Sequence, residues 1–295
     1  MRFVSRGGWT LHEMLISMCV MSGVVGLAAH AATSQLRFFR GIGEIVAVRG
    51  QLGQVGAIAA SVLGGVSPGE GDVIAASDSS IEVRVPVGTS VVCEGAPGRV
   101  TIPARVATGN ALSAFDELPA LGDEAHVFIA DSIGAGWVRT GLASGPTTGG
   151  SCLHFPGVSE TWVLQLREPL AIPAGSVLRV SRPMGLSVYR ASDGRWYFGG
   201  RDWNGPLGRL NVVQPIAGPL KAYSADPSRS GLTFRYYDRA GAALAAPVTL
   251  TRIARVTVHA RAEGRRPVRV AGIAPGTGFT FADSALTVIG LRNAP

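Results

Sequence analysis

The sequence predicts an α+β protein in which a long N-terminal helix precedes an antiparallel, β-rich body. The first observation behind this class is an apolar run, Met14 to Ala29, which contains no charged residue. The second is a stripe of apolar side chains that continues beyond this run at three- and four-residue steps, as on one face of a helix. The third is composition: 40 Gly, 18 Pro and only 16% charged residues indicate many turns and short strands rather than a helical bundle.

A short basic leader, Met1 to Gly8, precedes the apolar run. As a helix, Met14 to Ala29 rises about 24 Å, slightly less than the roughly 30 Å hydrocarbon core of a membrane, and flanking residues close most of the gap. Glu13 stands at the start of the run. A charge at membrane depth costs roughly 2.5 to 3.5 kcal/mol on insertion scales, and such residues are usually paired and functional. We therefore expect a membrane-spanning helix whose carboxylate has a specific role.

The segment Gly8-Trp9-Thr10-Leu11-His12-Glu13, with the leader and the apolar run, resembles the class III signal of type IV prepilins and type II secretion pseudopilins. In that family a peptidase cuts after the Gly and leaves an aromatic residue at position one and Glu at position five. Here those positions are Trp9 and Glu13. The sequence departs from the family pattern at Trp9, where Phe is usual, and at His12, where an aliphatic residue is preferred.

The resemblance implies a pilin-like lollipop, in which a long N-terminal membrane helix packs on an antiparallel, β-sheet-rich globular body. Its parts would be a leader peptide (1–8), a transmembrane and assembly helix (9–32), an amphipathic continuation (33–65) and a β-rich pilin body (66–295). The implied protein is a minor pilin or pseudopilin, similar to the PilW-like and GspJ-like branch, with no enzymatic activity, no cofactor and no metal. The implied partners are prepilin peptidase, other pilins or pseudopilins, an inner-membrane assembly platform and membrane lipid. The chain would cross the bacterial inner membrane once, with its body in the periplasm, before it enters a pilus or pseudopilus.

The resemblance also assigns roles to single residues. Cleavage would fall between Gly8 and Trp9, and Trp9 would carry the N-methyl group. The new amine of Trp9 would be a cation near the membrane surface, with the Glu13 anion one helical turn deeper, so that each carboxylate meets a neighbour's amine in a growing fibre. Ser22, Gly23 and Gly26 would let neighbouring helices approach closely, as small residues do in membranes.

Other interpretations of the N-terminus remain open. Ala29-His30-Ala31 fits the A-x-A pattern of a secretory signal peptide cut after Ala31, which would release a soluble β-domain protein or enzyme. A lipoprotein signal would need a small residue before Cys19, where Met18 stands. A plain membrane anchor explains the apolar run but gives Gly8 and Glu13 no role.

The helix is expected to continue from about Trp9 to Leu63 and to end at Gly64-Gly65. Its second half should bury one stripe against a sheet: Ile42, Ile45, Val48, Leu52, Val55, Ala59 and Val62. Five glycines, each costing up to roughly 1 kcal/mol, are expected to bend or locally melt it: Gly41, Gly43, Gly50, Gly53 and Gly56.

Strands are expected after the helix, bounded by turn residues. The candidates are Asp72 to Ala76, Ser80 to Val85, Thr89 to Cys93, Arg99 to Ile102, His126 to Ala130, Thr161 to Leu166, Val177 to Arg182, Leu186 to Arg190, Leu232 to Tyr236, Ile253 to Ala262 and a closing edge strand at Leu286 to Leu291. Asp193-Gly194 predicts a hairpin between its flanking strands. Gly141 to Gly150 and Arg201 to Gly208 are expected to be loops.

Two of the three cysteines, Cys93 and Cys152, fall in the exported part, where an oxidising compartment favours a disulfide between them. Closing a loop of about 60 residues would restrict the unfolded chain by roughly 4 kcal/mol. The alternative is two unpaired buried thiols. Cys19 in the apolar run is expected to behave as a small apolar residue.

The formal charge is +7, and it falls to +5 when the leader and its two arginines are removed. Six arginines form the densest charged cluster: Arg252, Arg255, Arg261, Arg265, Arg266 and Arg269. They fit either the solvated face of a strand or an anionic partner such as DNA on a competence pilus, the less favoured alternative. The pattern Gly65-Val66-Ser67-Pro68-Gly69 matches G-x-S-x-G but follows a helix, so we interpret it as a turn. The histidines form no H-E-x-x-H pair and there is no C-x-x-C, so zinc has no sequence support.

Overall fold

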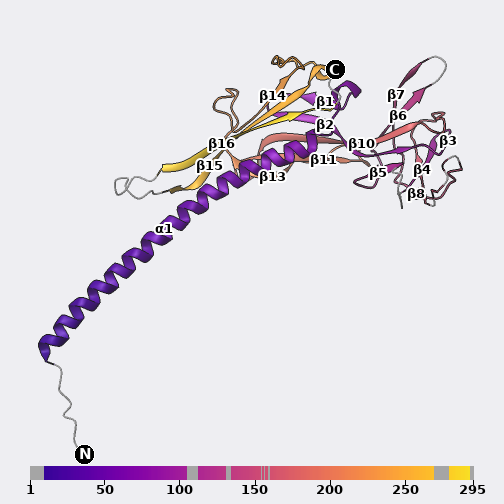
Figure 1. Cartoon of the computed structure of the whole chain (residues 1–295). Coiled ribbons are helices and arrows are strands. Elements are labelled where there is room, and N and C mark those ends of the chain that lie inside the picture. The colour runs from indigo at the N-terminus through magenta and orange to yellow at the C-terminus, as the bar shows by residue number, and fades with distance from the viewer. Residues whose placement is uncertain are drawn as a thin grey trace, which may run out of the picture. The chain divides into compact units, whose positions relative to one another are not determined.

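The computed structural model describes residues 10–104, 112–130, 134–153, 155, 157–158, 160–268 and 279–292. Within these residues, one long helix is followed by a large antiparallel β-sheet body, which confirms the α+β class (Figure 1). The elements are α1 (Leu11–Leu63), the 3-10 turn η1 (Pro68–Glu70), β1 (Val73–Ala76), β2 (Ser80–Val91), β3 (Glu94–Ala96), β4 (Arg99–Pro103), β5 (Ser113–Phe115), β6 (Glu124–Ala130), β7 (Ala135–Gly141), β8 (Thr147–Thr148), β9 (Thr161–Gln165), β10 (Val177–Arg190), β11 (Trp196–Asn204), β12 (Arg209–Leu210), β13 (Gln214–Leu220), β14 (Leu232–Tyr237), the 3-10 turn η2 (Leu250–Arg252), β15 (Arg255–Val268) and β16 (Phe279–Gly290).

The chain forms two compact units. The first comprises Met1–Gly50 and Glu263–Asp283, and the second comprises Gln51–Ala262 and Ser284–Pro295. α1, β15 and β16 contribute residues to both units. The body that the sequence predicts as 66–295 therefore shares its last strands with the N-terminal unit.

The first unit contains the apolar part of α1. α1 includes a stretch that is long and apolar enough, by length and composition, to cross a membrane, and none of that stretch is buried. Further along the same unit, Gly41 is buried because Val268 of β15 lies against the helix there, and an added Cβ at Gly41 would come within 3.1 Å of Val268 Cγ1. Close approach to a strand therefore explains this glycine.

In the second unit α1 buries one face, as the periodicity predicts. Leu52, Val55, Ala59 and Leu63 are at most 3% exposed. Gly56 lies on the same face and leaves no room for a Cβ, because the Thr287 side chain of β16 occupies that space. The helix assignment of α1 continues through all five glycines, so the expected local melting is absent. The predicted stripe is wrong at Ile42, which is 41% exposed.

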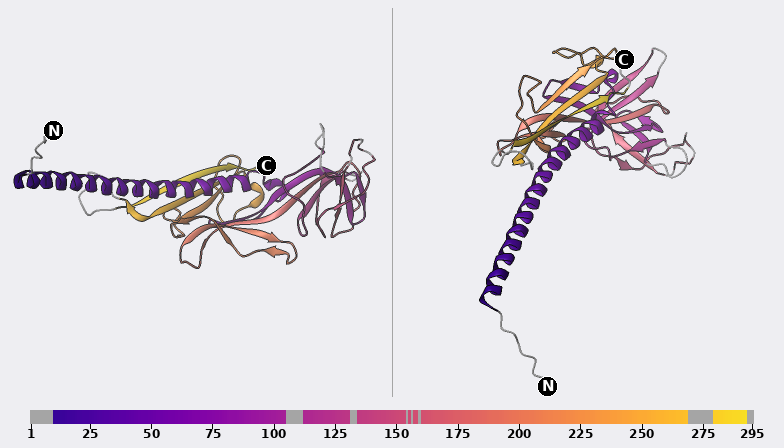
Figure 2. Two further views of the ribbon diagram at one scale, coloured as in Figure 1. Left: turned by 90° about the horizontal axis from the view of Figure 1, so that it is seen from below. Right: turned by 60° about the vertical axis from the view of Figure 1, so that its left-hand side comes forward.

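The largest sheet has nine strands and is organised around β10. β2 pairs antiparallel with β10 along most of its length, from Val177 to Ser187. On its other edge β10 pairs first with β6, up to Ser181, and then with β11, from Met184 onward. β5 joins β2, β7 joins β6, and β13 joins β11. Figure 2 shows β6 and β11 toward opposite ends of β10.

β2 and β10 are each one continuous strand in the structure, where two shorter strands are expected from the sequence. Prolines cause that separation, because Pro86 and Pro183 lack the amide hydrogen that a central strand normally donates. In the structure a register shift in the β2–β10 ladder lies beside Pro86, at Val180 and Ser181. Pro183 lies where β10 changes its neighbour from β6 to β11. The two prolines therefore occupy places where the ladder is already irregular, and the strands continue through them.

A four-stranded sheet, β3-β4-β9-β8, packs with part of the large sheet around one core. Fully buried side chains in this core come from both sheets: Val92, Val100, Ile102, Ala125, Val127, Leu164, Leu178 and Val180. Phe115 packs against the core and against Trp162, with ring centroids 5.6 Å apart. Val92 of this core directly precedes Cys93.

The third sheet has the order β14-β15-β16, so β16 is the edge strand that the sequence predicts. Val256, Val258 and Ala260, which alternate along β15, are buried, and Thr257 between them is buried as well. The Asp193-Gly194 hairpin is confirmed, since β10 and β11 pair on both sides of it and Gly194 has φ of 78°.

The remaining differences from the sequence prediction concern short strands and loops. β3, β5, β7, β12 and β13 were not expected. β11 runs to Asn204, so the loop predicted from Arg201 is wrong over its first half, and β8 lies within the loop predicted from Gly141 to Gly150. β8 and β12 each contain two residues, too few for a hydrophobic period to be recognised.

Candidate functional site

Glu13 is part of a reciprocal cap at the start of α1. Its Oε2 atom accepts hydrogen bonds from both the Thr10 N–H and the Thr10 hydroxyl, each at 3.0 Å. In return the Glu13 N–H donates to Thr10 Oγ1 at 3.4 Å. Thr10 is the residue before the first helical position and Glu13 is the third helical residue, which is the spacing of a capping box. The Thr-x-x-Glu spacing is visible in the sequence and predicts this cap, in addition to the assembly role expected for Glu13.

The cap uses one oxygen of the Glu13 carboxylate. Among the residues that the structure describes, no hydrogen bond or ion pair reaches the other oxygen, Oε1. Glu13 is exposed on the helix surface. The side chain can therefore hold the start of α1 with Oε2 while it presents Oε1 to a second group. Gly8 and Trp9, the expected cleavage and methylation residues, lie outside the described residues.

The small residues of α1 face open space. A Cβ added at Gly23 or Gly26 would meet no atom within 4 Å. The Ser22 hydroxyl donates back to the carbonyl of Met18 at 2.7 Å, so it needs no partner from another chain. Ser22 and Gly26 are four residues apart and share one face of the helix. Because the side chains on this face are small, another helix can pack closely on it.

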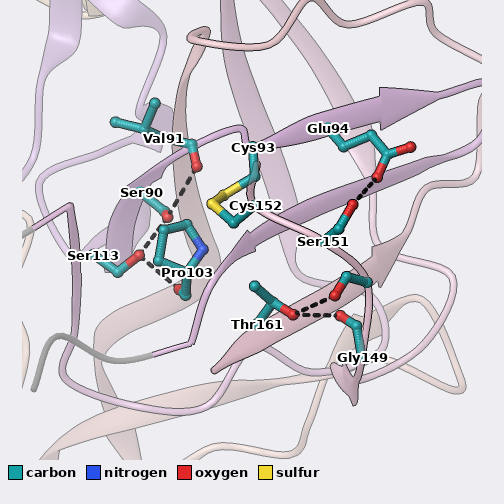
Figure 3. Close-up of a disulfide and its surroundings, with 11 residues drawn as sticks. Ser90, Val91, Cys93, Glu94, Pro103, Ser113, Gly149, Ser151, Cys152 and Thr161 are labelled. Carbon is teal, nitrogen blue, oxygen red and sulfur yellow. Dashed lines mark hydrogen bonds between the residues drawn. A yellow bond between two sulfur atoms is a disulfide. The ribbon is translucent and has the colours of Figure 1, made fainter. Parts of the chain in front are cut away.

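Cys93 and Cys152 form a disulfide, which is the pair that the sequence predicts (Figure 3). The bridge ties the end of β2 to the chain before β9, and the two Cα atoms are 4.8 Å apart. Next to it, the Ser151 hydroxyl donates to Glu94 Oε2 at 3.1 Å. The Thr161 hydroxyl donates to the Gly149 carbonyl at 2.7 Å and fixes the same segment to β9. Cys19 is a free cysteine on the exposed part of α1.

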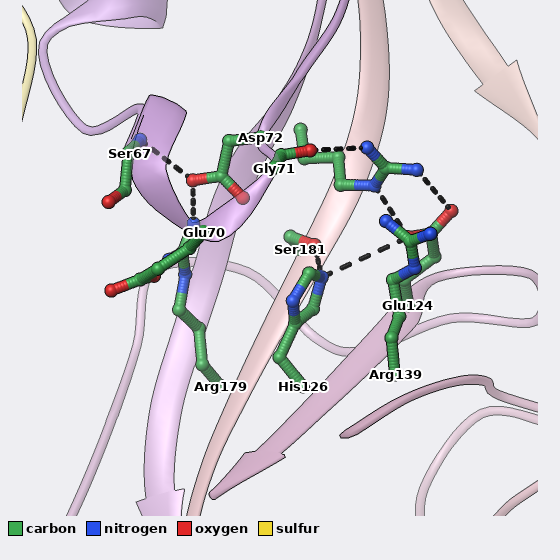
Figure 4. A network of polar contacts seen from close by, with 10 residues as sticks. Ser67, Glu70, Gly71, Asp72, Glu124, His126, Arg139, Arg179 and Ser181 are labelled. Atoms are coloured by element: carbon green, nitrogen blue, oxygen red, sulfur yellow. Dashed lines mark hydrogen bonds and ion pairs between the residues drawn. The ribbon is translucent and has the colours of Figure 1, made fainter. Parts of the chain in front are cut away.

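A buried network of charged side chains joins the turn after α1 to β10 (Figure 4). The guanidinium of Arg179 on β10 binds the carboxylates of both Glu70 and Asp72. Asp72 is fully buried, and its Oδ2 also accepts the Ser67 N–H at 2.8 Å. Because a buried carboxylate without a partner is costly, Arg179 is needed to hold η1 in place. The sequence does not predict that Arg179 pairs with Glu70 and Asp72, because the partners are more than a hundred residues apart.

His126 lies at the centre of the same region and is 3% exposed. Its Nε2 atom is 3.0 Å from the Ser181 hydroxyl oxygen. Burial, as the main cause, and the nearby Arg179 charge together lower the pKa of His126 to about 4, against the opposing effects of Asp72 and Glu124. The ring is therefore neutral at pH 7. Although the pair has the spacing of a nucleophile and its base, Ser181 is fully buried, so no substrate reaches its hydroxyl in this structure.

The arginine cluster predicted from the sequence is divided among local contacts. Arg252 forms an ion pair with Asp238 at 3.1 Å. Arg255 stacks on Tyr237, with its Cζ atom 4.8 Å from the ring centroid. Arg261 donates to two backbone carbonyls, at Pro227 and Ser230. Arg265 and Arg266 belong to the other unit and are exposed, and Arg269 lies outside the described residues. The cluster is not one continuous cationic surface.

The comparisons with known proteins found no relative. No protein-family model matches the chain, and neither a curated protein nor a solved structure is similar to it at a significant level. Within the described part of the chain, no group of three or more His, Cys, Asp or Glu side chains is placed to hold a metal ion. Any functional conclusion therefore depends on the geometry and the sequence alone.

Proposed function

We propose that this chain is a minor pilin or pseudopilin, a structural subunit of a type IV pilus or type II secretion pseudopilus. The observation that carries the proposal is the Glu13 carboxylate at the start of an exposed apolar helix, with Oε2 in the cap and Oε1 open to a second group. An anion in this position needs a cationic partner once the helix enters a membrane or a fibre. The amine that cleavage after Gly8 would create at Trp9 of a neighbouring subunit is such a cation.

The arrangement of α1 supports the same proposal. Its first part exposes an apolar surface with an open Ser22 and Gly26 face, suited to other helices or lipid. Its second part packs on the β-rich body through Leu52, Val55 and Ala59. These features of α1 fit the lollipop plan that the resemblance implies. The Cys93–Cys152 disulfide fits a body that folds in the periplasm.

The alternative of a secreted protein cut after Ala31 receives less support. Ala29-His30-Ala31 lies inside α1, with uninterrupted helix on both sides. A peptidase that cuts there would have to open the helix, whereas the family's cut after Gly8 falls before the first helical residue, Leu11. A DNA-binding role is also less favoured, because most of the described arginines in the predicted cluster already have partners within the chain.

Two matched variants test the role of the Glu13 charge. Glu13→Gln removes the charge but keeps an oxygen that accepts the Thr10 hydrogen bonds. Thr10→Val removes the hydroxyl of the cap, at a cost of about 1 kcal/mol, but keeps the charge. The measurement is an immunoblot of sheared fibres beside a blot of whole membranes. We expect Glu13→Gln to remain in the membrane but to be depleted from fibres, while Thr10→Val enters fibres nearly as well as the wild type.

Two results would contradict this mechanism. Entry of Glu13→Gln into fibres at the wild-type level would exclude charge pairing. Equal depletion of Glu13→Gln and Thr10→Val would show that the cap, rather than the charge, is what assembly requires.

A further inference from the structure

The charged residues of α1 begin abruptly after the apolar segment. Met14 to Leu36 contains no Asp, Glu, Lys or Arg and, as a helix, rises about 34 Å, enough for the hydrocarbon core and part of one headgroup layer. Arg37 follows directly, and Arg40 lies one turn further. Between them, Phe38 and Phe39 are 62% and 66% exposed. Because Arg37 is the first charged residue after the apolar run, we expect α1 to leave the hydrocarbon core near this level.

A cleft of about 540 Å³ opens at this level, within the N-terminal unit. Arg37, Arg40, Gly41, Gly43 and Glu44 of α1 line one side. Arg266 and Pro267, at the end of β15, line the other side. Three guanidinium groups from two elements therefore converge on one cleft. Gly43 adds no side chain to the cleft, and no atom lies within 4 Å of the place where its Cβ would be.

The carboxylates near the cleft are already engaged. Glu44 Oε2 accepts the Arg265 N–H at 2.9 Å. Asp283 pairs with Arg49 at 3.1 Å. In the described parts of this unit, Arg37, Arg40 and Arg266 form no ion pair. The cleft thus presents three exposed guanidinium groups without a counter-charge from the described chain.

We propose that this cleft binds the phosphate headgroup of an anionic phospholipid in the outer leaflet of the membrane. Guanidinium groups bind phosphate oxygens through paired, charge-assisted hydrogen bonds. The exposed apolar helix before Arg37, with Phe38 and Phe39 at the level of the cleft, offers a surface to acyl chains. A lipid has such chains and free phosphate does not. The inference rests on the proposed function, because it requires that α1 crosses a membrane with the body outside.

The test uses the full chain, purified in detergent and titrated with phosphatidylglycerol, phosphatidylcholine or inorganic phosphate, with bound species counted by native mass spectrometry. The triple variant Arg37→Gln/Arg40→Gln/Arg266→Gln removes the cleft charges. The control Arg195→Gln/Arg209→Gln/Arg239→Gln removes three exposed arginines of the body and keeps the same net charge. We expect the wild type and the control to prefer phosphatidylglycerol over phosphatidylcholine, and the cleft variant to lose about tenfold or more in phosphatidylglycerol affinity.

Equal binding of the two lipids by the wild type would overturn the inference, as would an unchanged affinity in the cleft variant. Displacement of the lipid by inorganic phosphate at equal concentration would assign the cleft to a free anion instead. Fractionation of cells separates this failure from failure of the proposed function. If only the lipid inference fails, the wild type and the cleft variant both remain in the membrane fraction. If the wild type is a soluble protein that begins at Ala32, the proposed function and the inference both fail.

Discussion

At the scale of single residues, burial decides which polar side chains support the fold. Arg179, Asp72 and His126 lie within one network, yet they differ in charge. Arg179 and Asp72 neutralise each other, whereas His126 lies near charges of both signs and remains neutral chiefly because it is buried. Ser181 gives the neutral ring a hydrogen-bond partner. The network therefore depends on a histidine that must not gain a proton.

This arrangement predicts that acid destabilises the body through His126. The folded pKa is about 4, whereas the unfolded ring titrates near 6.5, so the unfolded chain binds more protons between these values. Stability from this group is complete above pH 6.5 and falls as the pH drops toward 4, by about 3 kcal/mol in total. Unfolding followed by tryptophan fluorescence at several pH values measures it.

The variant His126→Gln cannot titrate, so its stability should change less over this range than that of the wild type. His259→Gln is the control, because His259 is more exposed, although its pKa is also lowered, chiefly by burial. A wild-type stability that is constant from pH 6.5 to 4 would contradict the prediction.

Glu13 shows what a sequence does and does not reveal about one residue. Its position before an apolar run identified it as unusual. Its partner in the cap, Thr10, was also readable from the three-residue spacing, because a capping box is a local pattern. The Arg179 network was not readable, because it joins η1 to β10 and depends on how the sheet is assembled.

At the scale of secondary-structure elements, the glycines of α1 divide into two kinds. Gly56 lies on the buried face against Thr287, whereas Gly53 has no atom within 4 Å of an added Cβ. Gly53→Ala should therefore stabilise the protein by up to about 1 kcal/mol through helix propensity. Gly56→Ala should destabilise it by about 1 to 3 kcal/mol, because the new methyl group displaces β16. Thermal unfolding of the two variants side by side measures the difference, and a gain in stability from both would show that α1 does not pack on β16 as described.

The disulfide restrains the segment between β7 and β9. In the described residues this segment contains only the short strand β8. Cys93→Ser/Cys152→Ser should lower the free energy of unfolding by about 4 kcal/mol, since the bridge closes a loop between residues 59 apart. Serine at both positions leaves no free thiol in the body. Chemical unfolding of the variant and of the wild type, with and without reductant, measures the effect. Reductant should weaken the wild type alone, and equal stability of oxidised wild type and variant would contradict this role.

At the scale of the whole molecule, the class and the long helix were predictable because they depend on strong periodic patterns. The apolar run and the stripe from Val48 to Ala59 extend over many turns, and β15 alternates clearly. The strand order around β10 was not predictable, because several strands compete for the same edges and short strands such as β12 carry no period. The prolines also misled, since Pro86 and Pro183 end a strand by local rules but occupy irregular places in this sheet.

The cleft at Arg37 and Arg266 illustrates the same limit. The sequence showed Arg266 only as one member of a basic cluster in the body. It gave no reason to place that residue beside α1, because β15 reaches the helix through a tertiary contact between Val268 and Gly41. Once this contact is known, two separate groups of arginines become one site.

The mature amino terminus tests the central proposal most directly. Intact-protein mass spectrometry of the chain isolated from the membrane fraction gives its first residue, with the disulfide reduced to remove ambiguity. We expect a chain that begins at Trp9, with or without an N-methyl group, because a cut after Gly8 leaves Glu13 at position five. A mature chain that begins at Ala32 would contradict it, since Glu13, Ser22 and Gly26 would then be absent from the functional protein.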